Sequence, residues 1–353
     1  MIEKCSPARN LEDISTILHL TDEELAWKEN SFGLPVLISP YYLSLIDPDD
    51  PNDPIRRQVV PNCQEQFSMD SESQDPLSEE KHMSVNRLIH RYPSRAAFLV
   101  TDVCATYCRH CFRRRFSGGT EGSASREDIM AAATYIAMHK QIKEVLLTGG
   151  DPLTLSDSRL DDLLSIFREQ RPDIILRICS RIPVTFPQRI TDDLIKMIKK
   201  HDSAPFYLFT QFNHPREITE QSKRAIARFV DAGIPAMNQT VLLKGVNDSA
   251  DILVELVEAL VAIRVKPYYL FQGDLVGGTS HLRVDLEKGM ALEQEMRQRV
   301  SGLAMPVYAI DLPDGGGKVP LGACYLEGRD ASGYWVFKTV EGLKRVYPDP
   351  TKK

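Results

Sequence analysis

Apolar, β-rich runs alternate with amphipathic stretches along most of this chain, and this alternation limits the folds open to it. Seven such runs are found, at 96–101, 144–148, 174–178, 206–210, 236–242, 267–271 and 306–310. Helix-like stretches such as 161–167 and 252–260 separate them. Strands that alternate with helices at a spacing of roughly 30 residues form parallel sheets built from βαβ units. The sequence therefore predicts an α/β protein with six or seven parallel strands, short of a complete eight-fold barrel.

Polar residues follow several of these predicted strands at the point where each strand ends. The second run leads into Gly149-Gly150-Asp151, the sixth into Gln272-Gly273-Asp274, and the last into Asp311. In barrels of βα units the carboxyl ends of the strands meet at one mouth, where catalytic groups gather. Turns are polar in general, so it is the set of segments that predicts a site. The two glycines have no side chains, so the backbone there either approaches a ligand closely or makes a tight turn.

Three cysteines follow the first predicted strand. Cys104, Cys108 and Cys111 are separated by four and three residues. Three thiolates in such a loop can hold three irons of an iron–sulfur cube, which leaves the fourth iron without a protein ligand. A structural zinc site would need a fourth Cys or His, and His110 is awkwardly placed between two ligands. The triplet therefore favours a catalytic open cluster, with structural zinc or packing cysteines as the alternative.

A glycine-rich segment, 311–318, follows the last predicted strand and ends in Lys318. Three consecutive glycines cost backbone entropy, which is justified where the backbone must pass close to something. A lysine there could bond to the aldehyde of pyridoxal phosphate, or it could be a solvated lysine on a surface turn. Arg91 and Arg95 flank a Tyr-Pro-Ser turn before the first strand. Their guanidiniums suit bidentate phosphate binding, although an exposed basic turn is the alternative.

The composition of the chain limits the kinds of partner and the cellular location that we expect for it. Its net charge of −6 argues against a general nucleic-acid binder, and 42% hydrophobic residues are ordinary for a globular protein. No run is long enough to span a bilayer and the N-terminus lacks a signal-peptide core, so we expect no membrane association. The 7 cysteines do not form a secreted disulfide pattern. We therefore expect a cytoplasmic protein.

The first 90 residues differ from the rest, being acidic and rich in proline. Residues 34–38 and 41–46 within them are too apolar to remain in water. We therefore expect an ordered N-terminal helical layer that packs on the rest of the chain and covers it. The predicted division of the chain is a covering region at 1–90, a barrel at 91–312 and a short C-terminal segment at 313–353.

Several segments, taken with the CxxxCxxC pattern and the Gly-Gly-Asp turn, resemble the radical S-adenosylmethionine enzymes. Within these, the chain resembles lysine 2,3-aminomutase and its relatives. The segments that carry this resemblance are 90–95 (HRYPSR), 107–116 (YCRHCFRRRF), 212–215 (FNHP), 238–239 (NQ), 242–247 (LLKGVN), 266–269 (KPYY) and 315–318 (GGGK). The likeness extends from 40–46 to about residue 321. It implies a partial (β/α)6 barrel that binds a [4Fe–4S] cluster, S-adenosylmethionine and pyridoxal 5'-phosphate.

The resemblance also implies roles for individual residues. The implied cluster ligands are Cys104, Cys108 and Cys111. The residues implied to line the S-adenosylmethionine site are Gly149, Gly150, Asp151 and Gln239. The residues implied to hold pyridoxal phosphate are Lys318, by a covalent bond, and Arg91, Tyr92 and Arg95 around the phosphate. The residues implied to bind substrate are Arg113, at the α-carboxylate, and Asp274 and Asp311, at a side-chain ammonium.

The two aspartates bear on which substrate is expected. Two carboxylates at one mouth repel each other unless a cation lies between them. A lysine side chain supplies that cation and donates three hydrogen bonds, whereas a glutamate side chain would add a like charge. With Asp274 and Asp311 at these positions, the expected activity is a redox-neutral 1,2-amino shift that converts L-lysine to β-lysine, the work of an isomerase. The alternative is that both residues merely cap strand ends.

Other functions remain open from the sequence. They are a glutamate or arginine aminomutase, a lysine aminomutase of the elongation factor P pathway, and a non-catalytic iron–sulfur sensor. The chain also departs from the family pattern at Gln211, where many members have His, at Phe271, where a Tyr is common, and in a glycine run that is one residue short. Some members of the family bind zinc through a cluster of cysteines near the C-terminus. No cysteine follows Cys324 in this chain, so we expect no zinc. As partners we expect an electron donor such as flavodoxin or ferredoxin, and a second copy in a homodimer.

Overall fold

A computed structural model describes residues 6–28, 34–313 and 315–348 of this chain. Its centre is a ten-stranded sheet in the order β1 to β10. The parallel strands are β3 (Arg95–Thr101), β4 (Glu144–Gly149), β5 (Ile175–Cys179), β6 (Phe206–Thr210), β7 (Ala236–Val241), β8 (Val265–Phe271) and β9 (Val307–Leu312). They coincide with the seven predicted runs. The predicted α/β partial barrel is confirmed.

Antiparallel strands extend this sheet at both edges. β1 (Met83–Val85) and β2 (Leu88–Tyr92) precede β3, and β10 (Gly317–Pro320) pairs with β9. The two edges of the sheet approach each other. The backbone N–H of Lys318 in β10 donates a hydrogen bond to the hydroxyl of Tyr92 in β2 at 3.1 Å. The sheet therefore curls into an open barrel, and its edge strands bring residues from opposite ends of the sequence together.

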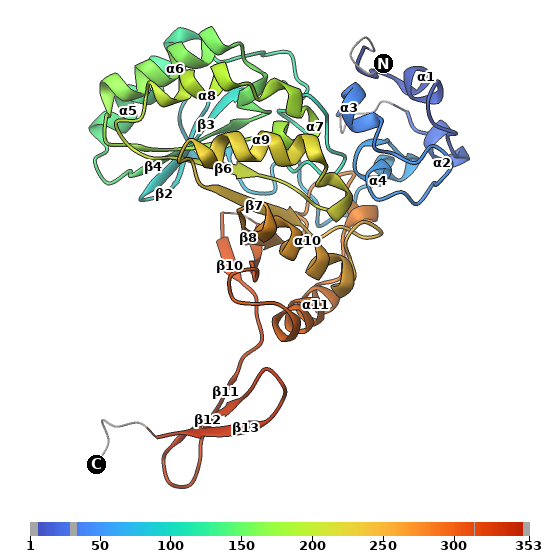
Figure 1. Ribbon diagram of the computed structural model, residues 1–353, viewed down its shortest axis with the longest axis vertical. Helices are drawn as coiled ribbons and strands as arrows, with labels where there is room; N and C mark the ends of the chain where they lie inside the picture. The colour runs from blue at the N-terminus through green and yellow to red at the C-terminus, as the bar shows by residue number, and fades with distance from the viewer. Residues whose placement is uncertain (1–5, 29–33, 314, 349–353) are drawn as a thin grey trace.

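The helices between the strands cover the outer face of the sheet (Figure 1). The longer ones are α5 (Arg126–Met138), α6 (Asp157–Gln170), α8 (Asp192–Lys199), α9 (Glu220–Asp231), α10 (Ala250–Ala262) and α11 (Leu286–Arg299). Most begin at a Ser or Thr whose hydroxyl accepts from a backbone N–H of the first turn, as Ser125, Thr191 and Ser249 do. Such caps satisfy amide groups that a helix start leaves without partners. Leucine, isoleucine and valine from both layers form one large core.

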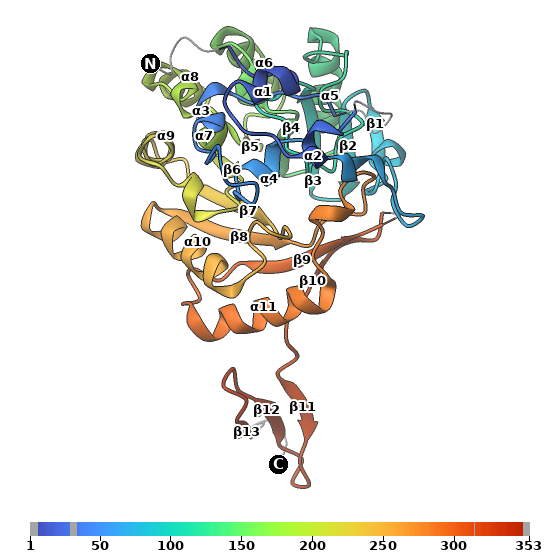
Figure 2. The same ribbon diagram turned by 90° about the vertical axis from the view of Figure 1, so that its right-hand side faces the viewer.

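The N-terminal region forms an ordered layer of short helices, as predicted. They are α1 (Leu11–Ser15), α2 (Asp22–Leu25), α3 (Pro40–Leu43) and α4 (Arg56–Val59). Figure 2 shows this layer in front of the strands of the barrel. Backbone bonds join it to the loop after β3: Tyr107 donates to Leu37 and Arg109 donates to Gln58, both at 2.8 Å. The layer therefore covers the strand ends where the site was predicted.

Short elements complete the connections. They are the 3-10 helices η2 (Cys63–Gln66), η3 (Glu80–His82), η4 (Pro152–Thr154), η5 (Pro187–Arg189), η6 (Pro215–Glu217) and η7 (Ser280–Leu282), and the helix α7 (Ile182–Thr185). None of the helices of the described residues is long and apolar enough to cross a lipid bilayer.

A separate three-stranded antiparallel sheet lies beyond β10. It consists of β11 (Leu326–Arg329), β12 (Trp335–Lys338) and β13 (Lys344–Tyr347), and it projects away from the barrel (Figure 1). The sequence did not suggest these strands. β2 crosses the predicted boundary at residue 90, and β10 of the large sheet lies beyond the predicted boundary at 312. The division of the chain into three parts stays a prediction.

Candidate active site at the strand ends

The cysteine loop runs without regular structure from the end of β3 to α5. Cys104, Cys108 and Cys111 are free thiols, each partly exposed. Burial raises the pKa of Cys104 well above its ordinary value, and that of Cys111 also rises. Among the described residues no group of three or more His, Cys, Asp or Glu side chains is arranged to hold a single metal ion. In an iron–sulfur cube each of three thiolates would bind a different iron.

The Gly-Gly-Asp turn after β4 is packed against the start of this loop. A Cβ on Gly149 would lie 2.6 Å from the carbonyl oxygen of Thr101, and one on Gly150 would lie 2.8 Å from the carbonyl carbon of Asp102. The N–H groups of Gly150 and Asp151 donate to Thr101 and Val103 at 2.5 and 2.8 Å. The close approach that these glycines permit is thus to the protein's own backbone. Their role at S-adenosylmethionine stays a prediction.

Asp151 is occupied by hydrogen bonds within the chain. Its carboxylate accepts from the backbone N–H groups of Leu153 at 3.0 Å, Arg181 at 2.7 Å and Ile182 at 3.1 Å. Burial raises the pKa of Asp151 to about 6, and these hydrogen bonds oppose that rise. The side chain therefore joins the loops after β4 and β5. Gln239, predicted at the same cofactor, lies half-buried on β7 beside Tyr269 of β8.

The predicted cofactor lysine lies directly opposite a predicted substrate aspartate. Lys318 on β10 and Asp311 on β9 are cross-strand partners, and the ammonium of Lys318 forms an ion pair with Asp311 Oδ2. The same ammonium lies 4.8 Å from the ring centroid of Phe271, at the end of β8. Asp314, in the loop between these two strands, lies outside the described residues. The structure thus joins two residues that the sequence assigned to different ligands.

Arg91, Tyr92 and Arg95 converge on this lysine from the other edge of the sheet. The guanidinium of Arg95 stacks on the Tyr92 ring at 3.8 Å, and an Arg91 nitrogen lies 3.8 Å from Asp311 Oδ1. Nε and one terminal nitrogen of Arg91 are buried without a hydrogen-bond partner in the described part of the chain. Buried N–H groups are rarely left unpaired. This cation beside Lys318 therefore fits an anionic group such as the phosphate of pyridoxal phosphate.

Arg113 is held by a residue of the N-terminal layer. Its Nε and one terminal nitrogen donate to the Glu79 carboxylate, the closest at 2.8 Å, and its other terminal nitrogen donates to Thr148 Oγ1 at 2.9 Å. Glu79 was not predicted as a site residue. Glu79 orients the guanidinium of Arg113. The binding of a substrate carboxylate by Arg113 stays a prediction.

The pKa of Asp274 is affected by the charged residues around it. Burial and the neighbouring Asp311 raise the pKa of Asp274 to about 7, while Lys318 opposes the rise. Glu79 and Arg113 also act on it, with opposite signs. The two aspartates therefore lie close enough to influence each other. Their binding of a substrate ammonium stays a prediction.

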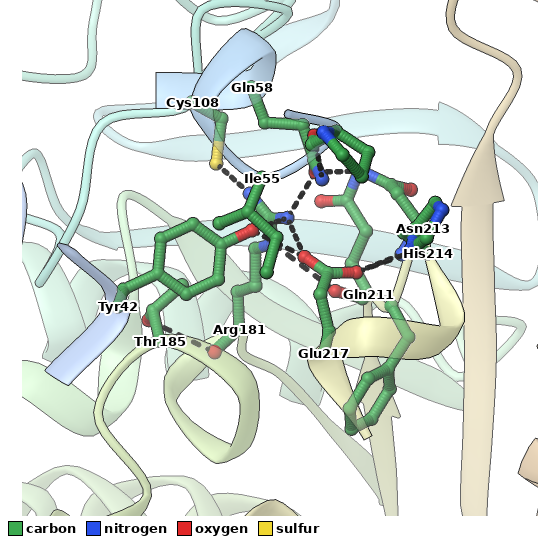
Figure 3. A network of polar contacts seen from close by, with 12 residues as sticks. Tyr42, Ile55, Gln58, Cys108, Arg181, Thr185, Gln211, Asn213, His214 and Glu217 are labelled. Atoms are coloured by element: carbon green, nitrogen blue, oxygen red, sulfur yellow. Dashed lines mark hydrogen bonds and ion pairs between the residues drawn. The ribbon is translucent and has the colours of Figure 1, made fainter. Parts of the chain in front are cut away.

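Arg181, which was not predicted as a site residue, makes a direct contact with a cysteine of the triplet. Its terminal nitrogens donate to Cys108 Sγ at 2.7 Å and to Glu217 Oε1 at 2.7 Å (Figure 3). Arg181 follows β5 after Ser180, at the same end of the sheet as the other site residues. The rule of polar residues after strands, applied to the third strand as well, would have found it.

His110 and His214 both make hydrogen bonds within the chain. The His110 ring is buried, which lowers its pKa well below the ordinary value, and its Nε2 lies 3.1 Å from the Gln211 amide nitrogen. Nδ1 of His214 accepts from the backbone N–H of Arg216 at the start of η6. Gln211, where the family pattern often has His, is thus the amide partner of His110.

Comparison with known proteins places this architecture in a class. Residues 98–257 match the model of the Radical SAM superfamily, and residues 293–353 match a model described as Lysine-2,3-aminomutase. The L-lysine 2,3-aminomutase of Clostridium subterminale is 43% identical over 96% of this chain and 81% of its own length. The glutamate 2,3-aminomutase of Clostridioides difficile is 41% identical over 94% of this chain and 78% of its own length. A radical SAM methyltransferase from Sphaerobacter thermophilus superposes with a TM-score of 0.46 at 16% identity, covering 64% of this chain and 68% of its own.

The match to the family model and the relatives that match nearly the whole chain define a radical SAM protein. More narrowly, the chain belongs to the lysine 2,3-aminomutase family. The resemblance drawn from the motifs is confirmed, and with it the family's cofactors: an iron–sulfur cluster, S-adenosylmethionine and pyridoxal phosphate. Which residues hold each cofactor stays a prediction.

Proposed function

We propose that this protein is an isomerase that converts L-lysine to β-lysine by a 1,2-amino shift. The observation that carries the proposal is the pair of aspartates around Lys318. Burial and Asp311 raise the pKa of Asp274 to about 7, so two ionised carboxylates at this position are mutually unfavourable. A substrate with a cationic side chain relieves that repulsion, and lysine has one.

The chain's residues divide the binding of the three cofactors among them. Cys104, Cys108 and Cys111 would hold the iron–sulfur cluster, and the turn at 149–151 and Gln239 would line the S-adenosylmethionine site. Lys318 would bond to pyridoxal phosphate, with Arg91, Tyr92 and Arg95 at its phosphate. Bound together, these groups supply radical hydrogen abstraction and an aldehyde that carries the migrating amino group.

The remaining work is positioning and proton control by the protein. Arg113 would hold the α-carboxylate of the substrate, and Asp274 and Asp311 its side-chain ammonium. The Lys318 ammonium must lose a proton before its nitrogen can bond to an aldehyde, and Asp311 Oδ2, its ion-pair partner, is the adjacent acceptor. The N-terminal layer over the strand ends would exclude water and oxygen from the reaction.

Incubation of the anaerobically reconstituted, reduced protein with lysine, glutamate and arginine in parallel tests this function. We expect β-lysine from lysine and no product from the other two. The Lys318→Ala variant is expected to keep its iron, lose the absorbance of bound pyridoxal phosphate and form no product. β-Glutamate as the main product would favour the second candidate, for which a 41%-identical glutamate 2,3-aminomutase speaks. Bound iron without S-adenosylmethionine cleavage on any amino acid would instead indicate a sensor.

The partners and setting of the enzyme belong to the same proposal. The cluster needs a one-electron donor such as flavodoxin or ferredoxin, and a cytoplasmic location would keep it reduced. A homodimer is supported by the projecting sheet of β11 to β13, whose large apolar side chains are exposed. They include Leu326 at 43%, Phe337 at 36% and Tyr347 at 59% exposure. The covering region at 1–90, the barrel at 91–312 and the segment at 313–353 are proposed as its three parts.

A further inference from the structure

A buried arginine links the cysteine loop to the N-terminal layer. Arg181 lies between β5 and α7 and is 8% exposed. Its backbone N–H donates to Asp151 Oδ2 at 2.7 Å, and its Nε donates to the carbonyl oxygen of Gln211 at 3.2 Å. These bonds fix both ends of the residue. They leave the two terminal nitrogens directed at other partners.

Those terminal nitrogens face a cysteine on one side and a carboxylate on the other (Figure 3). One donates to Cys108 Sγ at 2.7 Å. The other donates to Glu217 Oε1 at 2.7 Å, Gln58 Oε1 at 2.5 Å and the Tyr42 hydroxyl at 3.0 Å. Tyr42 also donates its hydroxyl hydrogen to Glu217. No nitrogen of Arg181 is left without a partner, so the guanidinium has a single well-determined orientation.

This contact distinguishes Cys108 from the other two cysteines. In the described part of the chain the sulfurs of Cys104 and Cys111 accept no hydrogen bond from a charged side chain, and the Cys111 thiol instead donates to the Ser117 hydroxyl at 3.8 Å. The supporting residues Tyr42 and Gln58 come from α3 and α4 of the N-terminal layer. The N-terminal layer therefore helps to hold the Arg181 guanidinium against the sulfur of Cys108.

We propose that Arg181 is a positioning residue that raises the reduction potential of the cluster by donating a hydrogen bond to the Cys108 sulfur. The proposal rests on the proposed cluster at the three cysteines. One electron from the external donor enters the cluster on reduction, and the added negative charge spreads onto the ligand sulfurs. A cationic donor at one of them stabilises the reduced state, because hydrogen bonds to sulfur and local charge set the potential of such clusters. Glu217, as the counter-charge, limits the size of that effect.

A redox titration of the reconstituted full-length protein, without S-adenosylmethionine and monitored by electron paramagnetic resonance, tests the proposal. For Arg181→Gln we expect the ratio of reduced to oxidised cluster at a fixed potential to fall at least tenfold, which is about 59 mV for one electron. For Glu217→Gln we expect the ratio to rise, because the cation loses its counter-charge. Tyr42→Phe keeps both charges and is the matched control, with an expected change of less than threefold.

Opposite shifts in the two variants distinguish tuning from general loosening, which would move both in one direction. Unchanged potentials, or shifts of the same sign, would overturn the proposal. If one of the two variants fails to retain iron, the sign of the shift in the other decides. Wild-type protein that binds no iron would instead refute the proposed cluster itself, so the two failures are distinguishable.

Discussion

Asp274 is the single residue whose ionisation most clearly reports on the site. Burial and Asp311 raise its pKa to about 7, whereas an aspartate in an unfolded chain titrates near pH 3.9. Between these values the folded state binds more protons than the unfolded state. The contribution of Asp274 to the free energy of unfolding therefore falls as the pH rises from about 4 to about 7, and above pH 7 the penalty is complete.

Replacement by asparagine should remove this penalty. At pH 8 we expect Asp274→Asn to be more stable than the wild type by roughly 1–3 kcal/mol, less than the full shift would give because the residue is partly exposed. At pH 4 the difference should vanish. Urea unfolding of both cofactor-free proteins at several pH values measures it. The exposed Asp70, substituted in the same way, is the control. A difference that does not depend on pH would contradict the assignment.

Residues of the site differed in how well the sequence predicted them. Lys318, Asp311, Arg91 and Tyr92 were selected from motifs, and the structure brings them together. Glu79 could not be selected, because its meeting with Arg113 depends on how the N-terminal layer folds back over the barrel. Contacts between segments far apart in the chain leave no local pattern in the sequence. Residues at strand ends can be predicted because the order of the strands in the sheet places them at one end of the barrel.

The turn after β4 is an element whose packing has a testable energetic consequence. A methyl group at Gly150 would overlap the backbone of Asp102 and Val103. Overpacking of this kind costs typically 1–3 kcal/mol, and here backbone atoms cannot move aside easily. We expect Gly150→Ala to lose about 2–3 kcal/mol of stability and much of its iron, because the turn supports the cysteine loop. Gly302, which has nothing within 4 Å of an added methyl, should tolerate alanine. Denaturant unfolding and iron analysis of both variants measure these effects, and equal stability and iron content in the two variants would contradict the prediction.

A buried ion triad holds the N-terminal layer to the cysteine loop. Glu65 pairs with Arg109 at 2.5 Å and with Arg114, and all three side chains are almost fully buried. Burial alone would raise the pKa of Glu65, but the two guanidiniums outweigh it and lower the pKa. The stability that this pairing contributes is therefore present above the ordinary pKa of a glutamate and is lost as the pH falls through the lowered value.

Glu65→Gln should destabilise the protein by about 3–5 kcal/mol at neutral pH, because two buried guanidiniums lose their anion. Thermal or denaturant unfolding measures the loss, which should shrink at low pH. Glu220, an exposed residue that pairs with Lys223, provides the matched substitution and should leave stability unchanged. Equal effects at the two positions would show that the layer does not depend on the triad.

Elements of the barrel were predictable and those outside it were not. Each parallel strand is a run of five to seven residues. Burial alternates along β5 and β7 and is continuous toward the ends of β3, β4 and β6, and both patterns can be recognised in a sequence as apolar β-rich runs. The helices α2, α3 and α4 have four residues each, too few for a periodic pattern. β11 to β13 also have four residues each. Of these only β12 contains an apolar run, Trp335-Val336-Phe337, while β11 and β13 include charged residues and show no such pattern.

On the scale of the whole molecule, the barrel lies between a covering layer and a projecting sheet. The layer is joined to the barrel by backbone bonds and the buried triad. The sheet of β11 to β13 meets the helical body through the Gln298 amide, which donates to the Val340 carbonyl at 3.0 Å. A sheet of three short strands has little stability alone unless it covers an apolar face. Its apolar face therefore needs a partner surface, which the proposed homodimer would supply.

The register of the sheet identifies that face and provides a sharp test. Phe337 lies opposite Leu326 on one neighbouring strand and opposite Arg345 on the other, and it follows Trp335, whose partners are Arg329 and Tyr347, by two residues. These side chains share a face that is apolar apart from the two arginines, while the adjacent Lys338 points to the other face. A charge in the centre of an apolar interface should be costly to bury. We expect Phe337→Glu to weaken the homodimer at least tenfold in sedimentation experiments, while the melting temperature of the barrel stays unchanged. Lys338→Glu introduces the same carboxylate on the opposite face and should leave association intact. Equal weakening by both would point to net charge, and no effect of either would place the dimer contact elsewhere.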